Sequence, residues 1–469
     1  MSRPLVVGNG EMLVTFDHGL NMRDLYYPYV GQCNHLQGNK NSLGIWVDGK
    51  FTWVDEAEWE KTLRYKQETL LTCIQLFNRN QEMSITINDA VHYHDNIFLK
   101  RLVIRNHAER PREVRVFFTH DFCIDETEVG DTAVYEPDPG ILYHYKKAKY
   151  FLVNGLSNGG GIYQYATGTK RFGGAEGTWR DAEDGHLQGN PIAQGSVDST
   201  VSFRSEIGPR GQDTVYYWLV AAKNFREVSK LNEYVLNRAP GNVLNSVELY
   251  WRQWVNKTDI NDDGLPKDVI GLYKRSLLII RTQVDKRGAI LAANDSDIMQ
   301  YNRDHYSYCW PRDGALVSYA LIRAGYPEMT EPFFRFCDNA LTPGGFLLHK
   351  YNPDGSVGSS WHPWILDGKT QLPIQEDETG LVIFALWEYY KCTKNIEYVL
   401  LLYRTLIRPA GKFMVRFMLD DYDLPRESYD LWEERRGIFT FTCSAVYGGL
   451  IAAANFAEIF ADCQSAELF

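Results

Sequence analysis

The sequence lacks the segments that would carry it into or across a membrane. No uninterrupted apolar run reaches the roughly 18 residues that a membrane-spanning helix needs. The opening segment, MSRPLVVGNG, has no apolar centre of the kind found in signal peptides. These absences predict a cytoplasmic protein with no membrane partner.

Paired cysteines and clustered positive charge are also missing. The chain forms no CxxC pair, so we expect reduced thiols at its eight scattered cysteines, which are Cys33, Cys73, Cys123, Cys309, Cys337, Cys392, Cys443 and Cys463. The net charge is −11 and no basic stripe is visible. A nucleic-acid partner requires clustered Lys and Arg, so this class of partner is excluded.

What the sequence does contain is an unusual number of aromatic rings. Among 469 residues there are 12 Trp, 29 Tyr and 23 Phe. Aromatic faces stack on the CH-rich faces of sugars, but they also fill protein cores, so the count alone does not choose between the two. The length predicts two domains, since one ordinary core does not grow this large.

The first domain is predicted to be rich in β-strands and to span residues 1–223. Short apolar or alternating runs separated by turn residues predict strands near 13–16, 44–48, 51–54, 83–87, 98–104, 114–118, 141–145, 150–153, 162–165, 199–203 and 213–220. Asp48-Gly49 is a hairpin signal because glycine accepts positive φ. So many short strands favour a large antiparallel β super-sandwich.

Residues 224–264 change to helical spacing and are interpreted as a helical linker. Within it, Asp259 to Gly264 resembles the start of a calcium-binding loop, but Ile270 stands where such a loop needs a bidentate Glu. Capping and turn chemistry before Pro266 explains the segment equally well, so a structural calcium ion is not supported. His92 and His94 lack a third ligand, and no metal site or cofactor is predicted.

The second domain, residues 265–469, has a period of 3.6 residues. This period predicts helices near 266–284, 311–325, 328–341, 375–391, 396–419 and 442–463. Long aromatic loops separate alternate helices, at 294–310, 344–373 and 420–437. Long ordered loops on a helical scaffold are usually functional. The alternation of long and short connections favours a toroid of helix pairs, of the (α/α)6 type, with a cleft on the loop-bearing face.

The last of these loops contains Ser428-Tyr-Asp-Leu-Trp-Glu-Glu-Arg-Arg-Gly437, in which two carboxylates follow an indole. Adjacent side chains point in different directions, so Glu433 and Glu434 are not expected to share one role. A carboxyl packed against an apolar ring is poorly solvated, a setting that suits proton donation near neutral pH. A solvated, salt-bridged surface turn is the competing interpretation of this charged run.

Two motifs give the chain a resemblance to a known family. The segment Asp304-His-Tyr-Ser-Tyr-Cys-Trp-Pro-Arg-Asp313 resembles the aromatic-x-Trp-x-Arg-Asp motif of the glucoamylase family, glycoside hydrolase family 15. Asp430-Leu-Trp-Glu-Glu434 is similar to that family's second motif, and Gln375-Glu-Asp377 is a weaker third match between them. The first half also resembles the β-sandwich that precedes the barrel in prokaryotic members, so the likeness covers almost the whole chain.

The resemblance implies a role for each matching residue. Glu433 matches the general acid that protonates the departing glycosidic oxygen. Arg312 and Asp313 match the pair that holds the hydroxyls of the terminal glucose, although a local ion pair at a helix start would also explain them. Such a site implies an inverting, exo-acting hydrolase that releases glucose from the non-reducing ends of α-glucans.

Further substrate-binding residues follow from the same motifs. Tyr306 matches a tyrosine close to the developing oxocarbenium ion. Trp432 and Glu434 match residues that line the first sugar subsites, and Trp310 of the first motif is counted with them as substrate-binding.

The resemblance assigns no residue of this sequence as the general base. An inverting glycosidase needs an acid and a base roughly 6.5–9.5 Å apart. In the family the base comes from the last helices of the barrel, so it is expected beyond residue 469 and the chain is expected to be a fragment or a truncated product. Asp377 and Glu378 are nearer in sequence, but the sequence places neither on the required face of the sugar.

Several functions therefore stay open. The substrate could be a starch-like α-1,4-glucan, a dextran as in glucodextranases, or trehalose. A non-catalytic glycan-binding or regulatory relative is a second class, and a disaccharide phosphorylase of similar architecture is a third. An oligomer is a further alternative, because an incomplete toroid would expose the apolar faces of its helices.

Overall fold

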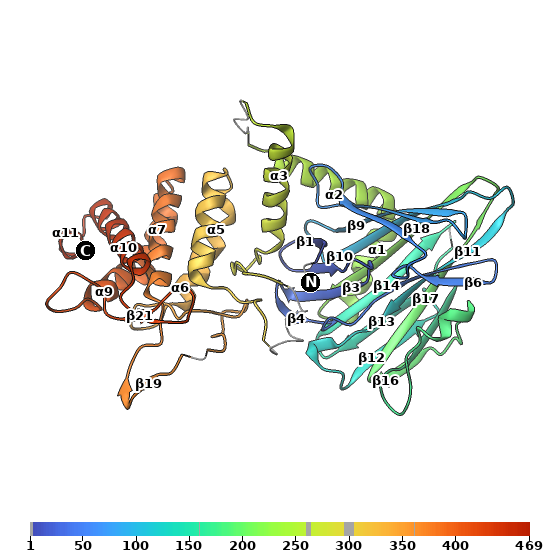
Figure 1. The fold of residues 1–469 in the computed structure, drawn as a ribbon, viewed down its shortest axis with the longest axis horizontal. Helices are drawn as coiled ribbons and strands as arrows, with labels where there is room; N and C mark the ends of the chain where they lie inside the picture. The colour runs from blue at the N-terminus through green and yellow to red at the C-terminus, as the bar shows by residue number, and fades with distance from the viewer. Residues whose placement is uncertain (1–2, 159, 259–263, 295–303, 361) are drawn as a thin grey trace. The chain divides into compact units, whose positions relative to one another are not determined.

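The structure, a computed structural model, describes residues 3–158, 160–258, 264–294, 304–360 and 362–469. The chain divides into two compact units. The first unit contains Met1–Thr282 and Asp295–Asp304, and the second contains Gln283–Asn294 and His305–Phe469. Figure 1 shows strands throughout the first unit and mainly helices in the second.

The strands in the described part of the first unit form three antiparallel sheets. The four-stranded sheet has the order β1(Leu5–Gly8), β2(Leu13–Phe16), β3(Met22–Tyr29), β4(Gln32–Asn34). The nine-stranded sheet has the order β16(Ile192–Gly195), β12(Asp131–Glu136), β13(Ile141–Lys146), β14(Lys149–Ser157), β18(Gln212–Ala222), β10(Ile97–Asn106), β9(Met83–Val91), β8(Thr72–Asn78), β7(Glu60–Tyr65). The five-stranded sheet has the order β15(Gln164–Thr169), β17(Val197–Ile207), β11(Arg112–His120), β5(Leu43–Val47), β6(Lys50–Trp53).

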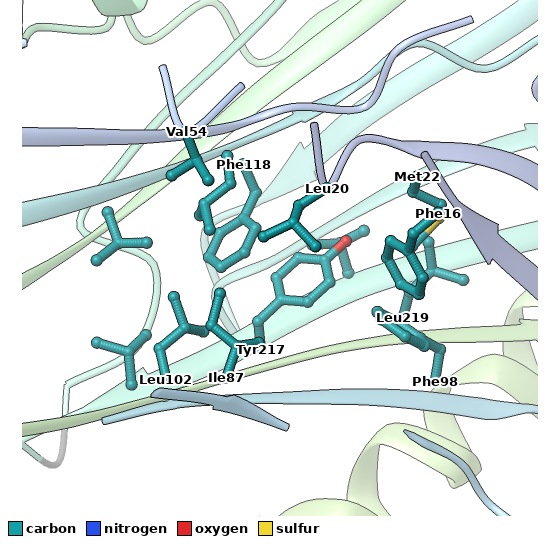
Figure 2. Close-up of a cluster of buried hydrophobic side chains, with 14 of the residues drawn as sticks. Phe16, Leu20, Met22, Val54, Ile87, Phe98, Leu102, Phe118, Tyr217 and Leu219 are labelled. Carbon is teal, nitrogen blue, oxygen red and sulfur yellow. The ribbon is translucent and has the colours of Figure 1, made fainter. Parts of the chain in front are cut away.

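The main apolar core of this unit draws side chains from all three sheets. Phe16 comes from the four-stranded sheet, Ile87 and Leu102 from the nine-stranded sheet, and Phe118 from the five-stranded sheet, and all four are buried (Figure 2). Each strand gives alternate side chains to this core, which is why the sequence shows a period of two. The predicted antiparallel β domain is confirmed.

All the predicted strand runs coincide or overlap with observed strands, and the Asp48-Gly49 hairpin is confirmed. Asp48 and Gly49 both have positive φ, at 51° and 84°, as a two-residue hairpin turn between β5 and β6 requires. The strands missed by the sequence analysis include β7 and β16, which are the two edges of the nine-stranded sheet. Both strands alternate exposed and half-buried residues and contain no fully buried side chain, so their apolar signal is weak.

The helices predicted for the linker form, and they pack on the nine-stranded sheet instead of standing between the domains. These are α1(Phe225–Arg238) and α2(Pro240–Val255). Val228, Val235 and Val247 join a second core with Trp218 of β18. Asn232 on α1 accepts a hydrogen bond from the Trp218 indole nitrogen at 2.9 Å.

The next helix, α3(Lys267–Thr282), also belongs to the first unit, so the two units divide after Thr282 and not at residue 265. Leu278 is buried in the second core. Arg275 donates to the Thr69 carbonyl at 2.5 Å, and its guanidinium lies 4.1 Å from the Tyr65 ring centroid. These long-range contacts lie beyond what helical periodicity can reveal.

Helices dominate the described part of the second unit, as predicted. They are α5(Pro311–Arg323), α6(Glu331–Ala340), α7(Glu376–Thr393), α8(Ile396–Leu402), α9(Arg408–Arg416), α10(Thr440–Ile459) and α11(Cys463–Leu468), with short 3-10 turns such as η4(Pro327–Met329). The predicted single helix 396–419 is interrupted by a π-helical turn, η5(Tyr403–Ile407), just before Pro409. Proline cannot donate a backbone hydrogen bond, which favours such an irregularity.

Within the second unit, α7 packs against α5 on one side and α10 on the other (Figure 1). Two small hairpins, β19(Ile365–Leu366) with β20(Lys369–Thr370) and β21(Ser428–Tyr429) with β22(Arg436–Gly437), lie in the long loops. The closed toroid of helix pairs stays a prediction.

One described helix, α10, is long and apolar enough to cross a bilayer by length and composition alone. Half of its most apolar window is buried inside the protein. Its buried residues include Leu450, Ala453 and Phe456, and it packs against α7. This is the behaviour of a core helix.

Close contact between α7 and α10 depends on two glycines, which gives the first testable prediction. A Cβ on Gly449 would lie 2.7 Å from the Gly380 Cα, whereas a Cβ on the neighbouring Gly448 would meet Phe384 at an ordinary 3.7 Å. We expect Gly449→Ala to lower the free energy of unfolding by about 1–3 kcal/mol through overpacking. Gly448→Ala should raise it by about 0.5–1 kcal/mol through helix propensity. Urea titrations of the two variants measure both effects, and a shift of the same sign in both would contradict the packing.

Candidate active site

The first predicted motif forms the start of α5. Trp310 precedes the helix in an extended conformation, and Pro311 occupies the first turn, where its missing N–H costs nothing. Arg312 and Asp313 therefore sit in the first turn. Their side chains form the predicted local ion pair, with 3.6 Å between Arg312 Nη2 and Asp313 Oδ2.

Arg312 also holds two carboxylates from the first turn of α7, and these were not among the predicted site residues. Arg312 Nη1 lies 3.2 Å from Asp377 Oδ2 and 3.1 Å from Glu378 Oε1. The Arg312 backbone N–H donates to the other oxygen of Glu378. The guanidinium thus sits among three carboxylates while only 10% of its side chain is exposed.

Burial and charge oppose each other at this cluster. Burial raises the pKa of Asp377 and Glu378, and the Arg312 charge acts in the opposite direction. Burial disfavours the charged form of Arg312, but the neighbouring carboxylates outweigh it and raise the pKa of the guanidinium. Glu376 has both carboxyl oxygens buried without a hydrogen-bond partner among the described residues, and burial raises its pKa well above the usual value.

The second motif forms the tip of the β21–β22 hairpin. Asp430 shapes this tip, because its Oδ1 accepts hydrogen bonds from the backbone N–H groups of Glu434 at 2.9 Å and Arg435 at 3.2 Å. Glu433 adopts a left-handed backbone conformation, with φ 60°. For a residue other than glycine this conformation costs about 1–3 kcal/mol, and such residues cluster at functional sites.

The turn sends the two adjacent glutamates in different directions, as predicted. The Glu433 side chain is 8% exposed, whereas Glu434 is exposed to solvent with Arg435 and Arg436. The prediction of a buried acid and the prediction of a solvated turn therefore each hold for part of the same stretch.

A hydrogen bond joins the two motifs. Trp310 Nε1 donates to Glu433 Oε1 at 2.6 Å. The ring that packs beside the Glu433 carboxyl is therefore that of Trp310 and not that of Trp432, which precedes it in the sequence. The Glu433 charge also contributes to the raised pKa of Asp313, behind the larger effect of burial. Glu433, Arg312 and Asp313 thus lie in one cluster.

Two histidines complete the surroundings of Glu433. His349 Nε2 lies 3.9 Å from Glu433 Oε2, and burial lowers the pKa of His349 to about 3, so its ring is neutral near pH 7. The His362 ring stacks on Tyr429 at 3.7 Å, and its Nε2 lies 3.4 Å from the Glu433 carbonyl oxygen. Burial lowers the pKa of His362 as well. His349 therefore faces the Glu433 carboxyl as a neutral ring, whereas His362 contacts the backbone of the same residue.

The remaining predicted residues lie at the surface of the cluster. Tyr306 is 51% exposed, and its ring centroid is 6.1 Å from that of Trp310. Trp432 is 75% exposed. Neither the Trp432 nor the Glu434 side chain makes a hydrogen bond or ring contact with the described residues around Glu433, so the structure does not bring these two to the carboxyl.

The sequence analysis missed the structural roles of Asp377, Glu378, His349 and His362. The run Gln375-Glu-Asp-Glu378 at the start of an apolar helix was a usable signal, since carboxylates at a buried helix start need a partner. No local signal marks His349 or His362, because each stands in a loop and meets Glu433 only in the folded chain.

Within the described part of the chain, no three His, Cys, Asp or Glu residues are grouped so that they could hold a metal ion. Residues 259–263 of the calcium-like loop lie outside the described residues.

The chain thus consists of an antiparallel β domain followed by a helical domain, with carboxylates and aromatic rings in the helical loops. Comparison with known proteins relates this chain to glycosyl hydrolases. Residues 271–469 match the family described as "Glycosyl hydrolases family 15". The chain is a glycosyl hydrolase family 15-like protein.

Individual relatives are distant. An uncharacterized glycosyl hydrolase of Methanocaldococcus jannaschii is 24% identical over 463 residues, which cover 97% of this chain and 69% of that protein. Trehalase 2 of Sulfolobus acidocaldarius is 27% identical over 185 residues, which cover 35% of this chain and 30% of the trehalase.

A solved structure shares the fold of the whole chain. The crystal structure of a bacterial glucoamylase complexed with acarbose superposes with a TM-score of 0.76 at 17% identity. The match covers 99% of this chain and 65% of the glucoamylase. The chain thus spans just under two thirds of that protein's length.

Proposed function

We propose that this chain acts as an inverting, exo-acting glycoside hydrolase that releases glucose from the non-reducing ends of α-glucans, with Glu433 as the acid and Arg312 and Asp313 as sugar-binding residues. The observation that carries the proposal is the hydrogen bond from Trp310 Nε1 to Glu433 Oε1, which brings a shielded carboxyl to the start of the helix that bears Arg312 and Asp313. A carboxyl beside a hydroxyl-binding ion pair suits the protonation of a glycosidic oxygen.

Glu433 is proposed to act as the general acid. Its Oε2 has no hydrogen-bond partner among the described residues, while Oε1 is held by Trp310. The held oxygen fixes the carboxyl, and the unpartnered oxygen is the one that can carry a proton to the leaving group. The neutral ring of His349 lies 3.9 Å from this unpartnered oxygen.

Asp313 and Arg312 are proposed to hold the terminal sugar. Asp313 exposes 43% of its side chain and can accept hydrogen bonds from two hydroxyls. Arg312 is fixed by Asp377 and Glu378, so it is preorganised before a sugar arrives. Asp377 and Glu378 are not proposed as the general base, because the Arg312 guanidinium already holds both.

A trehalase is the second candidate, favoured by the similarity to Trehalase 2. The two functions share an acid and a terminal-glucose site and differ in the aglycone. The loops beside Glu433 would then decide the substrate.

A substrate panel tests the proposal. We expect release of glucose from maltooligosaccharides, with the β-anomer formed first, and no attack on cyclodextrins, which have no chain ends. Acarbose, the ligand of the glucoamylase of similar fold, should inhibit. Faster hydrolysis of trehalose than of maltose would favour the trehalase. Saturable binding of maltose without hydrolysis would favour a glycan-binding relative, and neither binding nor hydrolysis of any of these sugars would contradict both hydrolase proposals.

A further inference from the structure

The β domain contains a second hollow with the chemistry of a saccharide site. It has a volume of about 280 Å³, close to the lower end of ligand pockets, which is roughly 300 Å³. It lies at one end of the five-stranded sheet, where it is lined by Trp53 of β6, Thr119 of β11 and Asp198 of β17. All its lining residues belong to the first unit.

Two indoles form its apolar wall. The rings of Trp53 and Trp179 are 6.4 Å apart at 60°. Trp53 Nε1 donates to Glu183 and Trp179 Nε1 to the Glu176 carbonyl, so both indole N–H groups are already used. The Arg180 guanidinium lies 4.7 Å from the Trp179 ring centroid and fixes this ring from the loop side. The two indoles therefore present fixed apolar surface to the hollow, and their N–H groups already donate hydrogen bonds within the protein.

The segment that carries Trp179 is anchored to the sheet through Asp198. The Thr178 backbone N–H donates to Asp198 Oδ2 at 2.6 Å, and the Thr178 hydroxyl donates to the same oxygen at 3.0 Å. Gly177, with φ 121°, permits this approach, because a Cβ there would lie 2.6 Å from the Asp198 carboxyl. Asp198 is 3% exposed, and its other oxygen has no hydrogen-bond partner among the described residues.

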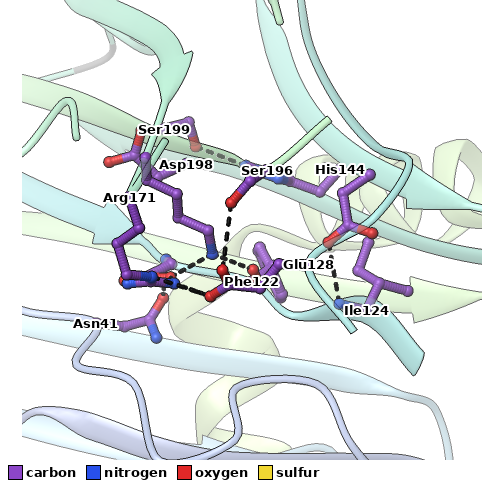
Figure 3. A network of polar contacts seen from close by, with 12 residues as sticks. Asn41, Phe122, Ile124, Glu128, His144, Arg171, Ser196, Asp198 and Ser199 are labelled. Carbon is purple, nitrogen blue, oxygen red and sulfur yellow. Dashed lines mark hydrogen bonds and ion pairs between the residues drawn. The ribbon is translucent and has the colours of Figure 1, made fainter. Parts of the chain in front are cut away.

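The charges around the hollow are balanced, which favours a neutral ligand. Lys40 Nζ lies 3.0 Å from Asp55 Oδ2. Asp121 is held by Lys170 and by both terminal nitrogens of Arg171. Arg171 also binds Glu128 (Figure 3). Burial raises the pKa of Asp198 to about 7, so its charge is only partly developed near neutrality. Neither an anion nor a cation finds an uncompensated full charge here.

We propose that this hollow binds one sugar residue of a neutral saccharide. Its CH face would pack on the indoles of Trp53 and Trp179, and its hydroxyls would bond to Lys40, Asp55 and the Asp198 carboxyl. The balance of charges argues against an organic cation, the other ligand that two indoles and nearby carboxylates would suit. This binding does not depend on the hydrolase activity proposed for the second unit.

The test uses the full chain carrying Glu433→Gln, so that hydrolysis of the added sugars is slow. Glucose, maltose and trehalose are titrated calorimetrically, and hydrogen–deuterium exchange then locates the protected segments. We expect maltose to protect residues 171–187 and the end of β6. Trp179→Ala and Asp198→Asn should each weaken this binding about tenfold or more, as for other buried ligand anchors.

Phe172→Ala is the matched control, because Phe172 is a 75% exposed aromatic on the same loop and does not line the hollow. It should leave affinity and protection unchanged. Asp198→Asn keeps an acceptor for Thr178, so it tests the hollow even if Trp179→Ala loosens the loop. The proposal is overturned if no sugar protects 171–187, if both variants bind as the parent does, or if tetramethylammonium binds more tightly than the sugars.

Discussion

Replacing Glu433 by Gln should lower kcat for maltooligosaccharides by about a hundredfold to ten-thousandfold, the usual contribution of a general acid. The amide oxygen of the substituted side chain can still accept the hydrogen bond from Trp310 Nε1, so the turn should keep its shape. The loss should be much smaller for 4-nitrophenyl α-glucoside, because a nitrophenolate departs without a proton. The measurement is the ratio of kcat for the two substrates in parent and variant.

Glu427→Gln is the control for this prediction. Glu427 lies in the same loop, is 57% exposed, and pairs with Arg436 at 3.1 Å. A surface pair of this kind contributes little, so both substrates should be hydrolysed at the parent rate. Equal losses on both substrates in the Glu433 variant would show that Glu433 is not the proton donor.

Arg312→Met should have the largest effect on stability. The substitution leaves Asp377 and Glu378 buried without their cation, and removing one partner of a buried ion pair costs about 3–5 kcal/mol. Urea unfolding followed by the helical circular dichroism signal measures this change. Arg323→Met, in the exposed last turn of the same helix, should change the free energy of unfolding by less than about 0.5 kcal/mol.

The cost of Arg312→Met should also depend on pH. Burial already raises the pKa of Asp377 and Glu378 in the folded chain, and loss of the guanidinium raises it further. The folded state then binds more protons than the unfolded state, so stability falls as the pH rises through the folded-state pKa values. The variant should therefore lose more stability than the parent between about pH 5 and about pH 8. A variant that is less stable at the lower pH would contradict this account of the cluster.

Local sequence signals were sufficient for much of the fold. Hairpins such as β5–β6 were predictable because Asp48 and Gly49 must adopt positive φ there. Helix starts such as Pro311 were predictable because proline tolerates the first turn. The edge strand β7 was not predictable, because only Leu63 and Tyr65 in it are apolar. The packing of α3 against Tyr65 and Thr69 was not predictable either, because helical periodicity does not identify the surface that a helix packs on.

For the candidate site, the sequence by itself determined the residue types and their order: Arg312 and Asp313 at a helix start, and an acidic turn at Glu433 and Glu434. Only the tertiary structure decided that Glu433 turns inward beside Trp310, that Trp432 and Glu434 face solvent, and that α7 supplies the carboxylates that hold Arg312. The physical reason is how far apart in the sequence the interacting residues stand. Backbone conformation and capping are fixed by neighbours in the chain, whereas burial, ion pairing and the pKa of a carboxyl depend on residues that only folding brings together.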